Sequence, residues 1–221
     1  LMIGLGTRFN IRQAGNDISN FAKDARKIFI NIDNGELNDG RVQGEYKLNI
    51  DLKLFFEKNK HLHYTCNSNW KSFQNKIRDE IKNIKSEYWE SKYVSPYLFC
   101  DFLSDKANEN AIIIPDAGQN VIVPAQSFKI KSGQRFVSSW ANSPMGYSFP
   151  ASIGAQFGSP DKQVICIIGD GGMQLNIQDL QTVKHYGLPI KIFIINNHVY
   201  GAILEFQDPE LGKRYEATDE E

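Results

Sequence analysis

The sequence has few cysteines, no excess of charge of either sign and no long apolar run. Its 221 residues include 3 cysteines, 25 Lys and Arg, and 26 Asp and Glu, which give a formal net charge of −1. A nucleic-acid-binding domain is expected to carry a basic excess, so this balance argues against a nucleic-acid partner. No apolar run approaches the roughly 18 residues of a membrane helix, so no membrane association is expected.

The cysteines Cys66, Cys100 and Cys166 form a set with wide spacings. Cys100 and Cys166 lie within apolar runs, which favours buried thiols over a redox or metal role. Free thiols are typical of a reducing compartment. The first residues, LMIGLGTRFN, also lack the basic and apolar regions of a signal peptide. Together these features favour a cytoplasmic protein.

Each end of the chain shows an expected secondary-structure element without its expected continuation. Residues 1–5 form a strand-like run that enters a turn with nothing before it to pair with. The last residues, EATDEE, follow shortly after the expected start of a helix. We therefore expect the chain to be a piece of a longer protein.

Residues 1–50 carry two strand-like runs, at 1–5 and 27–32, separated by a loop and a helix. This order is typical of a parallel sheet.

The glycines after the first strand invite comparison with a dinucleotide-binding fingerprint. Gly4 and Gly6 fit the start of GxGxxG, but Phe9 stands where the third glycine should be, so the pattern fails. Asp33 follows the second strand, where an acid could meet a ribose hydroxyl or serve as a turn residue.

Residues 66–93 combine high charge with apolar residues at steps of three and four. This spacing predicts an amphipathic helix that packs on a larger body and links two domains. The apolar positions are Trp70, Phe73, Ile77, Ile81, Ile84 and Tyr88. Just before this segment, His61 and His63 could bind a metal. No carboxylate or further histidine stands at ligand spacing, which favours a surface strand or loop.

From residue 94 to residue 221, apolar strand-like runs alternate with helical ones. Helices are expected near residues 97–106 and 176–185, a loop followed by a helix within residues 138–158, and strands near residues 111–115, 164–169 and 191–195. This alternation predicts an α/β fold, a parallel sheet flanked by helices on both faces.

The last two of these strands end in small polar residues, Gly169-Asp170-Gly171 and Asn196-Asn197. A helix between them makes a βαβ unit, which brings both strand ends to the sheet edge where α/β proteins bind ligands. Asp170 and Asn197 offer the oxygen ligands that Mg²⁺ prefers, and Gly171-Gly172 allows close approach of a phosphate. Either stretch alone is ordinary turn chemistry, but the pair predicts a magnesium–phosphate site.

The GDG…NN pair resembles the diphosphate and metal signature of thiamine diphosphate (ThDP) enzymes. Residues 94–207 are similar to the acetolactate synthase branch of that family. AIIIPDAGQN resembles the strand and turn that bring a Gly-Gln pair to the diphosphate, and SPMGYSFPASIGAQFG resembles the pyrimidine-binding loop and helix. GTRFNIRQAGN looks like the end of the family's middle domain.

The resemblance implies three parts and a role for each matched residue. Residues 1–65 would be the C-terminal part of a Rossmann-like middle domain, 66–93 a linker helix, and 94–221 the diphosphate-binding domain, truncated at its C-terminus. The implied Mg²⁺ ligands are Asp170, the Asn197 side chain and the Val199 carbonyl. The implied cofactor-binding residues are Gly118, Gln119, Asn120, Ser143, Met145, Gly169, Gly171 and Gly172. Met145 would also be the wedge that bends the cofactor, the one catalytic role carried over.

Three positions depart from the family pattern. Ser143-Pro144 replaces Gly-Thr before the methionine, Asn120 stands where histidine is usual, and Phe206 stands near a usual tryptophan. The last change bears on the acceptor substrate. Arg8 and Arg12 match arginines that contact FAD in the branch. The resemblance therefore leaves undecided whether FAD is a cofactor in addition to ThDP and Mg²⁺.

The resemblance also implies a missing partner. In the family, a glutamate from the N-terminal domain of a second subunit activates the cofactor, and no acid in this chain matches it. We therefore expect a homodimer or homotetramer of the full-length protein, with this chain alone inactive.

The leading interpretation is an acetolactate synthase-like enzyme that decarboxylates a 2-oxo acid, with pyruvate first, and transfers the carbanion to an acceptor. Alternatives are a ThDP-dependent lyase of surface-sugar or CoA-ester metabolism and a non-catalytic module that binds ThDP or phosphate.

Overall fold

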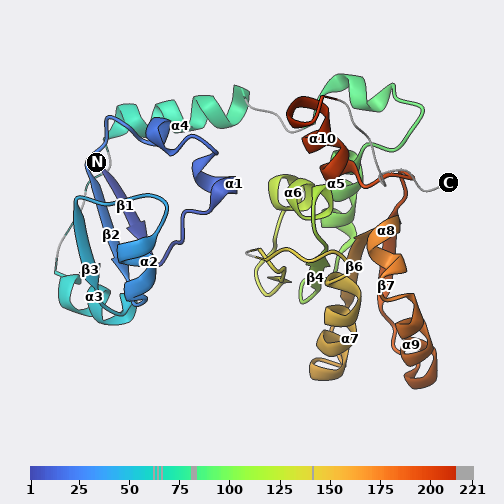
Figure 1. Cartoon of the computed structure of the whole chain (residues 1–221). Coiled ribbons are helices and arrows are strands. Elements are labelled where there is room, and N and C mark those ends of the chain that lie inside the picture. Colours follow the sequence, from blue (N-terminus) through green and yellow to red (C-terminus); the bar gives the residue numbers. More distant parts are fainter. Residues whose placement is uncertain (62, 64, 66, 81–83, 141, 213–221) are drawn as a thin grey trace. The chain divides into compact units, whose positions relative to one another are not determined.

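The computed structural model of the chain divides into two compact units, Leu1–Lys76 and Ile77–Glu221 (Figure 1). It describes residues 1–61, 63, 65, 67–80, 84–140 and 142–212, with the side chains of Arg12, Arg78 and Asp79 excepted. Predictions that concern Cys66, Ile81, the Arg12 side chain and residues 213–221 lie outside the described residues.

The first unit is built on a three-stranded parallel sheet of β1 (Met2–Leu5), β2 (Lys27–Asn31) and β3 (Tyr46–Asn49) in the order β1-β2-β3. The parallel sheet predicted from the two strand-like runs is therefore present, and β2 pairs with both β1 and β3. The helices of this unit are α1 (Ile11–Ala14), α2 (Asn34–Asp39) and α3 (Leu52–Asn59), with a 3₁₀ turn at Ile18–Asn20. Its core contains Ala14, Phe29, Leu37 and Val42.

The predicted single helix over residues 66–93 is wrong in length. Helix α4 spans Ser68–Glu80, and Ser86–Trp89 form a separate 3₁₀ turn. Lys85 before that turn is extended, with φ −97° and ψ 150°, so no continuous helix can pass through it. Trp70 and Phe73 stack on each other and remain about half exposed, so the apolar positions of α4 are less buried than the pattern predicted.

The second unit contains a four-stranded sheet in the order β5-β4-β6-β7, and every pair is parallel. The strands are β5 (Arg135–Phe136), β4 (Ile112–Pro115), β6 (Val164–Gly169) and β7 (Lys191–Ile195). β4 and β6 lie in the middle and are buried along their whole length, which is why they read as continuous apolar runs. The predicted parallel α/β sheet is confirmed.

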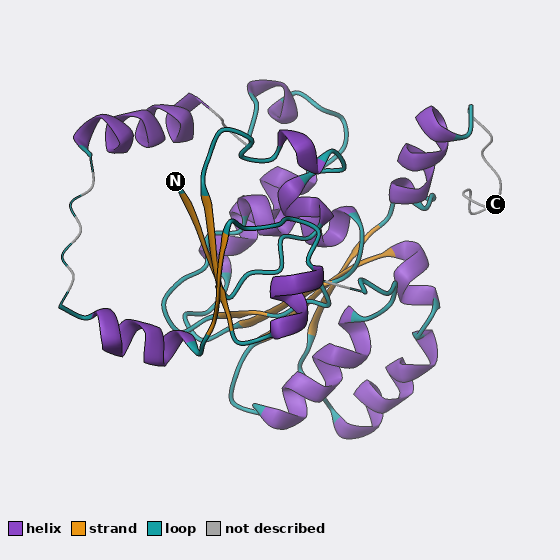
Figure 2. Ribbon diagram, turned by 60° about the vertical axis from the view of Figure 1, so that its left-hand side comes forward, coloured by secondary structure: helices purple, strands orange, loops and turns teal. Residues whose placement is uncertain are grey.

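Helices cover both faces of this sheet (Figure 2). Successive strand residues point to opposite faces, so the apolar strands contribute to a separate core cluster on each side. On one face, α5 (Pro96–Lys106) and the end of α6 (Gln119–Ser127) pack against Ile113, Ile165 and Ile167. On the other face, α7 (Ser148–Gly158), α8 (Asp170–Gln174) and α9 (Leu180–Tyr186) pack against Cys166 and Ile168. The predicted helix near 176–185 consists of the 3₁₀ turn Ile177–Asp179 followed by α9, and α10 (Gly201–Glu210) follows β7.

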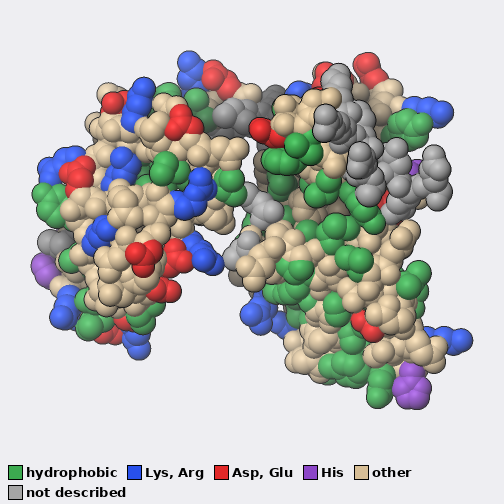
Figure 3. Space-filling model, in the orientation of Figure 1, with side chains coloured by type: hydrophobic (Ala, Val, Ile, Leu, Met, Phe, Trp, Pro, Cys, Tyr) green, Lys and Arg blue, Asp and Glu red, His purple; other side chains and the backbone are tan. Residues whose placement is uncertain are grey.

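Charges of both signs lie on the face of the first unit that Figure 3 shows. Figure 3 shows Lys and Arg side chains interspersed with Asp and Glu on the first unit, as the near-zero net charge predicts. Of the helices in the described part of the chain, none has both the length and the apolarity that a membrane crossing requires.

Candidate functional site

The ends of β6 and β7 lie side by side, with Gly169 paired to Ile195 in the last register position. Asp170 begins α8 directly after β6. One of its carboxylate oxygens, Oδ2, accepts N–H bonds from Asn197 at 2.9 Å and His198 at 2.7 Å. The two polar strand ends therefore meet at one sheet edge, as the βαβ argument predicted.

The turn after β7, whose backbone N–H groups contact this carboxylate, carries two further oxygen atoms. His198 takes a left-handed conformation, with φ 57°, which folds the chain back. The side-chain oxygen of Asn197 accepts an N–H bond from Val199 at 3.4 Å, and the Val199 carbonyl accepts one from Gly201 at 2.9 Å. One carboxylate and two neutral oxygens in such a turn suit a hard cation such as Mg²⁺.

A different kind of metal site, built from three His, Cys, Asp or Glu side chains, does not occur among the described residues. His61 and His63 are both exposed and belong to no such group. Their exposure agrees with the surface loop that the sequence favoured. The oxygen set at Asp170 differs in kind, because it contains a single acid.

A second turn, at the end of β4, lies against the same edge. Gly118 has φ 63° and ψ −140°, a conformation that glycine adopts readily, and it precedes the first residue of α6, Gln119. The Gln119 side-chain amide donates to both carboxylate oxygens of Glu205 on α10, at 3.0 and 3.3 Å. A Cβ added at Gly169 would lie 2.8 Å from the side-chain nitrogen of Asn120. The Gln119 and Asp170 turns are thus in contact.

The loop that carries Met145 is fixed to the end of β4 by Asp116. The Asp116 carboxylate accepts N–H bonds from Gly146 and Ser148, both at 2.9 Å, and the residue is only 3% exposed. Met145 itself is 39% exposed. Ser143, two residues earlier, has φ 48°, where the family pattern has glycine.

Asp116 is the residue of this site that sequence reasoning missed. It stood within the DAGQN stretch, but its role depends on amides 30 and 32 residues away. The available signal was an acid directly after a buried strand, the same signal that marked Asp170.

Gly172 brings the Met145 loop and the Asp170 turn together. A Cβ at Gly172 would lie 2.6 Å from Asp116 Oδ2 and 3.5 Å from the Gly146 nitrogen. The Asn176 side-chain amide donates to the Gly146 carbonyl at 2.9 Å from the other side. All four turns, 116–120, 143–148, 169–172 and 196–199, therefore gather at the carboxyl ends of β4, β6 and β7.

Beneath these turns lies a buried thiol. Cys166 contacts the Ser148 hydroxyl at 3.4 Å, and burial raises the pKa of the Cys166 thiol. Cys100 is also buried, and desolvation raises its pKa to about 11. The prediction of buried free thiols is confirmed for these two cysteines.

A family model described as "Thiamine pyrophosphate enzyme, C-terminal TPP binding domain" matches residues 116–221, which include all four turns. These residues belong to the thiamine pyrophosphate enzyme family. The domain of this family thus begins, by sequence match, at the residue that anchors the Met145 loop.

Curated relatives extend the similarity to nearly the whole chain. "Probable acetolactate synthase large subunit" of Methanococcus aeolicus is 35% identical over 97% of this chain. Acetolactate synthase isozyme 2 large subunit of Escherichia coli is 31% identical over 99%, and tobacco acetolactate synthase 1, chloroplastic, is 30% identical over 94%. The chain spans only 38%, 39% and 32% of these three relatives.

A solved structure shares the fold of this chain. The ThDP-dependent 4-hydroxybenzoylformate decarboxylase of Rhodococcus jostii aligns with a TM-score of 0.65 over 88% of this chain and 35% of its own. Its sequence identity of 22% makes this a likeness of fold.

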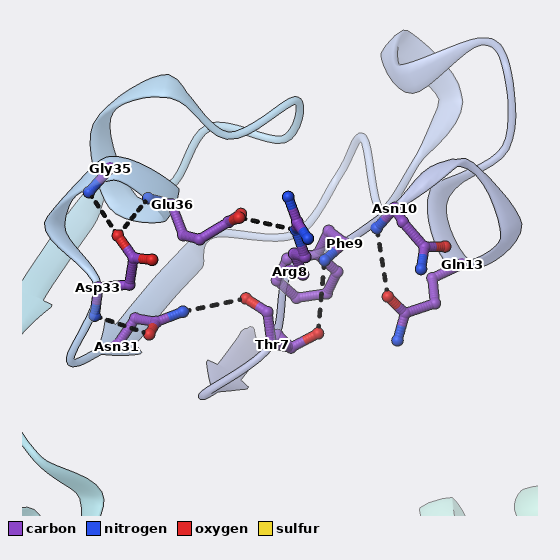
Figure 4. Close-up of polar contacts among 9 residues, drawn as sticks. All are labelled: Thr7, Arg8, Phe9, Asn10, Gln13, Asn31, Asp33, Gly35 and Glu36. Carbon is purple, nitrogen blue, oxygen red and sulfur yellow. Dashed lines mark hydrogen bonds and ion pairs between the residues drawn. The ribbon is translucent and has the colours of Figure 1, made fainter. Parts of the chain in front are cut away.

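The first unit places the residues considered for a nucleotide or flavin (Figure 4). Asp33 Oδ1 accepts N–H bonds from Gly35 and Glu36, so Asp33 caps α2, and the turn reading of this acid holds. Arg8 forms an ion pair with Glu36 at 2.7 Å. Any ligand phosphate would have to compete with Glu36 for this guanidinium. Phe9 lies against Gly4, where an added Cβ would meet the ring at 2.7 Å.

Proposed function

We propose that the chain is the ThDP- and Mg²⁺-binding part of an acetolactate synthase-like enzyme. The observation that carries the proposal is the meeting of the Asp170 carboxylate with the Asn197 turn at one edge of a parallel sheet. The acetolactate synthase names of the relatives support the same conclusion.

Two groups of residues would hold the diphosphate end of the cofactor. The Asp170 carboxylate, the Asn197 side-chain oxygen and the Val199 carbonyl would bind Mg²⁺, which pairs readily with diphosphate oxygens. The backbone and neutral side chains of residues 118–120 and the backbone of the 169–172 turn would contact the diphosphate itself. These are Gly118, Gln119, Asn120, Gly169, Gly171 and Gly172.

The Met145 loop would orient the aminopyrimidine end of the cofactor. The Ser143 carbonyl and the Met145 N–H would bind the aminopyrimidine, and the Met145 side chain would support the bent cofactor from below. Its partial exposure is what a side chain directed at a ligand requires. When bound, ThDP supplies the carbanion chemistry of 2-oxo acid decarboxylation, and the protein supplies binding and orientation.

The reaction of the whole protein would be decarboxylation of a 2-oxo acid, with pyruvate as the first candidate, followed by transfer to an acceptor. The activating glutamate would come from the N-terminal domain of a second subunit in a homodimer or homotetramer. This chain alone would bind the cofactor without turning over substrate. A cytoplasmic location is part of the proposal, and the two buried free thiols, Cys100 and Cys166, support it. Bound FAD, in contact with Arg8, would be an additional group of the longer protein.

Calorimetric titration of the 221-residue chain with ThDP tests the proposal directly. ThDP should bind in the presence of Mg²⁺ and lose most of its affinity when EDTA removes the metal. ADP is the comparison ligand, because a general phosphate-binding module would accept ADP and ThDP alike. Equal affinity for both would overturn the proposal in favour of that module.

The substrate requires the full-length protein. CO₂ release should be followed with pyruvate, 2-oxobutyrate and oxalyl-CoA. Turnover of pyruvate supports the acetolactate synthase reading, and exclusive turnover of oxalyl-CoA would replace it with a lyase of CoA-ester metabolism.

A further inference from the structure

Asp116 is a buried acid that none of the roles above employs. It is 3% exposed, and it lies directly after β4 in the middle of the sheet. Its backbone N–H donates to the Ile167 carbonyl of β6 at 2.9 Å, so the sheet itself fixes its position. Burying a carboxylate is costly unless hydrogen bonds compensate, so the partners of Asp116 need a reason.

The two carboxylate oxygens of Asp116 have separate partners on one loop. Oδ2 accepts the Gly146 N–H, and Oδ1 accepts the Ser148 N–H, both at 2.9 Å. These amides follow Met145 directly and lead into α7. Bonds of this kind, to an ionised acceptor, are about twice as strong as neutral ones. Asp116 therefore fixes the backbone on which Met145 is carried.

The same carboxylate also touches the turn that follows Asp170. Asp116 Oδ2 lies where a Cβ at Gly172 would come within 2.6 Å, so only glycine leaves it room. Oδ2 thus accepts the Gly146 N–H and also lies beside the position that a Cβ of residue 172 would occupy. The separation between the Met145 loop and the 169–172 turn therefore depends on Asp116, together with the Asn176 amide that holds the Gly146 carbonyl.

We propose that Asp116 is the positioning residue that sets the Met145 loop against the diphosphate-binding turn. It would thereby fix the distance between the two sites that hold opposite ends of a bent cofactor. The proposal rests on the proposed function, because it assigns those two ends to these two turns. Asp116 would touch neither substrate nor cofactor.

A merely structural role predicts a different result from a positioning role. If Asp116 only stabilised the fold, its loss would weaken every ligand of the site alike. If it sets the separation of two subsites, its loss should weaken a ligand that spans both subsites and spare one that occupies a single subsite. ThDP with Mg²⁺ spans both, and inorganic diphosphate with Mg²⁺ reaches only the 169–172 side.

The test uses Asp116→Asn, which keeps the shape but turns one acceptor into an N–H₂ donor that faces a backbone N–H. Asp161→Asn, the same change at an exposed acid, is the matched control. Affinities for ThDP·Mg²⁺ and diphosphate·Mg²⁺ are measured by calorimetry. Asp116→Asn should weaken ThDP about tenfold more than diphosphate, a loss typical of one charge-assisted hydrogen bond. Equal weakening of the two ligands would overturn the proposal.

A second variant covers failure of Asp116→Asn to fold. Asn176→Ala removes the amide that holds the Gly146 carbonyl from the opposite side. It should produce the same selective loss of ThDP affinity, about threefold, because a neutral hydrogen bond is weaker. An unchanged ratio of the two affinities in a folded Asn176→Ala chain would contradict the positioning role.

Nuclear magnetic resonance separates this proposal from the proposed function. In the ligand-free chain, Asp116→Asn should shift the Gly146 and Ser148 amide protons upfield, whatever the cofactor is. Unshifted amides would overturn the anchoring itself. Failure of the unmodified chain to prefer ThDP over ADP would instead overturn the proposed function, with the amide result unaffected.

Discussion

The Asp170 carboxylate and the His198 backbone nitrogen lie 2.7 Å apart, although 28 residues separate them in sequence. The same oxygen also accepts the Asn197 N–H at 2.9 Å. Asp170 therefore orders the turn that carries the Asn197 amide oxygen and the Val199 carbonyl. Asp170 therefore has a structural role, because it orders the proposed Mg²⁺ ligands without a metal. Its proposed role as a metal ligand is a second one.

Replacing Asp170 should separate these two roles. Asp170→Asn keeps an acceptor for one N–H bond but removes the negative charge, so the fold should persist while Mg²⁺-dependent ThDP binding falls at least tenfold. Calorimetry with and without Mg²⁺ measures the loss, and Asp161→Asn serves as the control acid. If Asp170→Asn bound ThDP with unchanged metal dependence, the metal assignment would be wrong.

Met145→Ala should affect ThDP and leave stability nearly unchanged. Because the side chain is 39% exposed, its truncation removes less buried apolar area than a core methionine would lose. We expect less than about 1 kcal/mol loss in the free energy of unfolding. Affinity for ThDP·Mg²⁺ should fall, and affinity for inorganic diphosphate·Mg²⁺ should not. Met145→Leu, whose side chain has similar bulk, should retain most of the affinity for ThDP·Mg²⁺. An equal loss in both ligands would exclude the wedge role.

Glu205 should oppose an anionic ligand at the Gln119 turn. Its carboxylate lies 3.0 Å from the Gln119 amide nitrogen, which is proposed to face the diphosphate. Glu205→Gln removes a negative charge at that point, so diphosphate should bind a few-fold more tightly at low salt, with less gain at high salt. Glu210→Gln, a charge change at the far end of the same helix, should leave the affinity unchanged. No gain at low salt would show that Glu205 does not face the ligand.

The central strands of the second unit could be predicted because buried strands consist mainly of apolar residues. Every residue of β4 and β6 is buried, so apolar residues are continuous there. β3 was missed because its two apolar residues, Tyr46 and Leu48, form only a short alternation, and all four of its residues are exposed. α6 was missed because Pro124 interrupts a helical reading, and β5 is only two residues long.

The candidate site could be predicted only where chain order alone brings residues together. Asp170 and Asn197 follow neighbouring strands of one βαβ unit, so their contact follows from topology. Asp116 and Gly146 belong to different connections, and their contact depends on how the loop before α7 closes over β4. The Glu205–Gln119 contact likewise depends on where α10 turns after β7. Local patterns contain neither relationship.

Ser143→Gly should stabilise the chain. Ser143 has φ 48°, a region that costs an ordinary L-residue about 1–2 kcal/mol and glycine almost nothing. Glycine also raises the conformational entropy of the unfolded chain, which offsets part of this stabilisation. The net increase in unfolding free energy should therefore be about 0.5–1 kcal/mol. The control is Ser159→Gly, since Ser159 has φ −148° and should only lose stability. Urea unfolding of both variants gives the comparison, and a loss at Ser143 equal to that at Ser159 would contradict the argument.

The buried Cys100 thiol should make stability depend on alkaline pH. Desolvation raises its pKa from 9.0 to about 11, so the folded chain holds this proton more tightly than the unfolded chain does. The resulting stabilisation is complete below about pH 9 and is lost as the pH rises towards 11. Cys166 shifts in the same direction, also because of burial. Urea unfolding at pH 8 and pH 10 should therefore show a fall in stability that Cys100→Ala reduces.

Alkylation at pH 8 supplies a second measurement of the buried Cys100 thiol. Cys100 should react slowly in the folded chain and rapidly in urea, because the thiolate is the reactive form. Rapid labelling of folded Cys100 at pH 8 would mean that its thiol is neither buried nor protonated in solution.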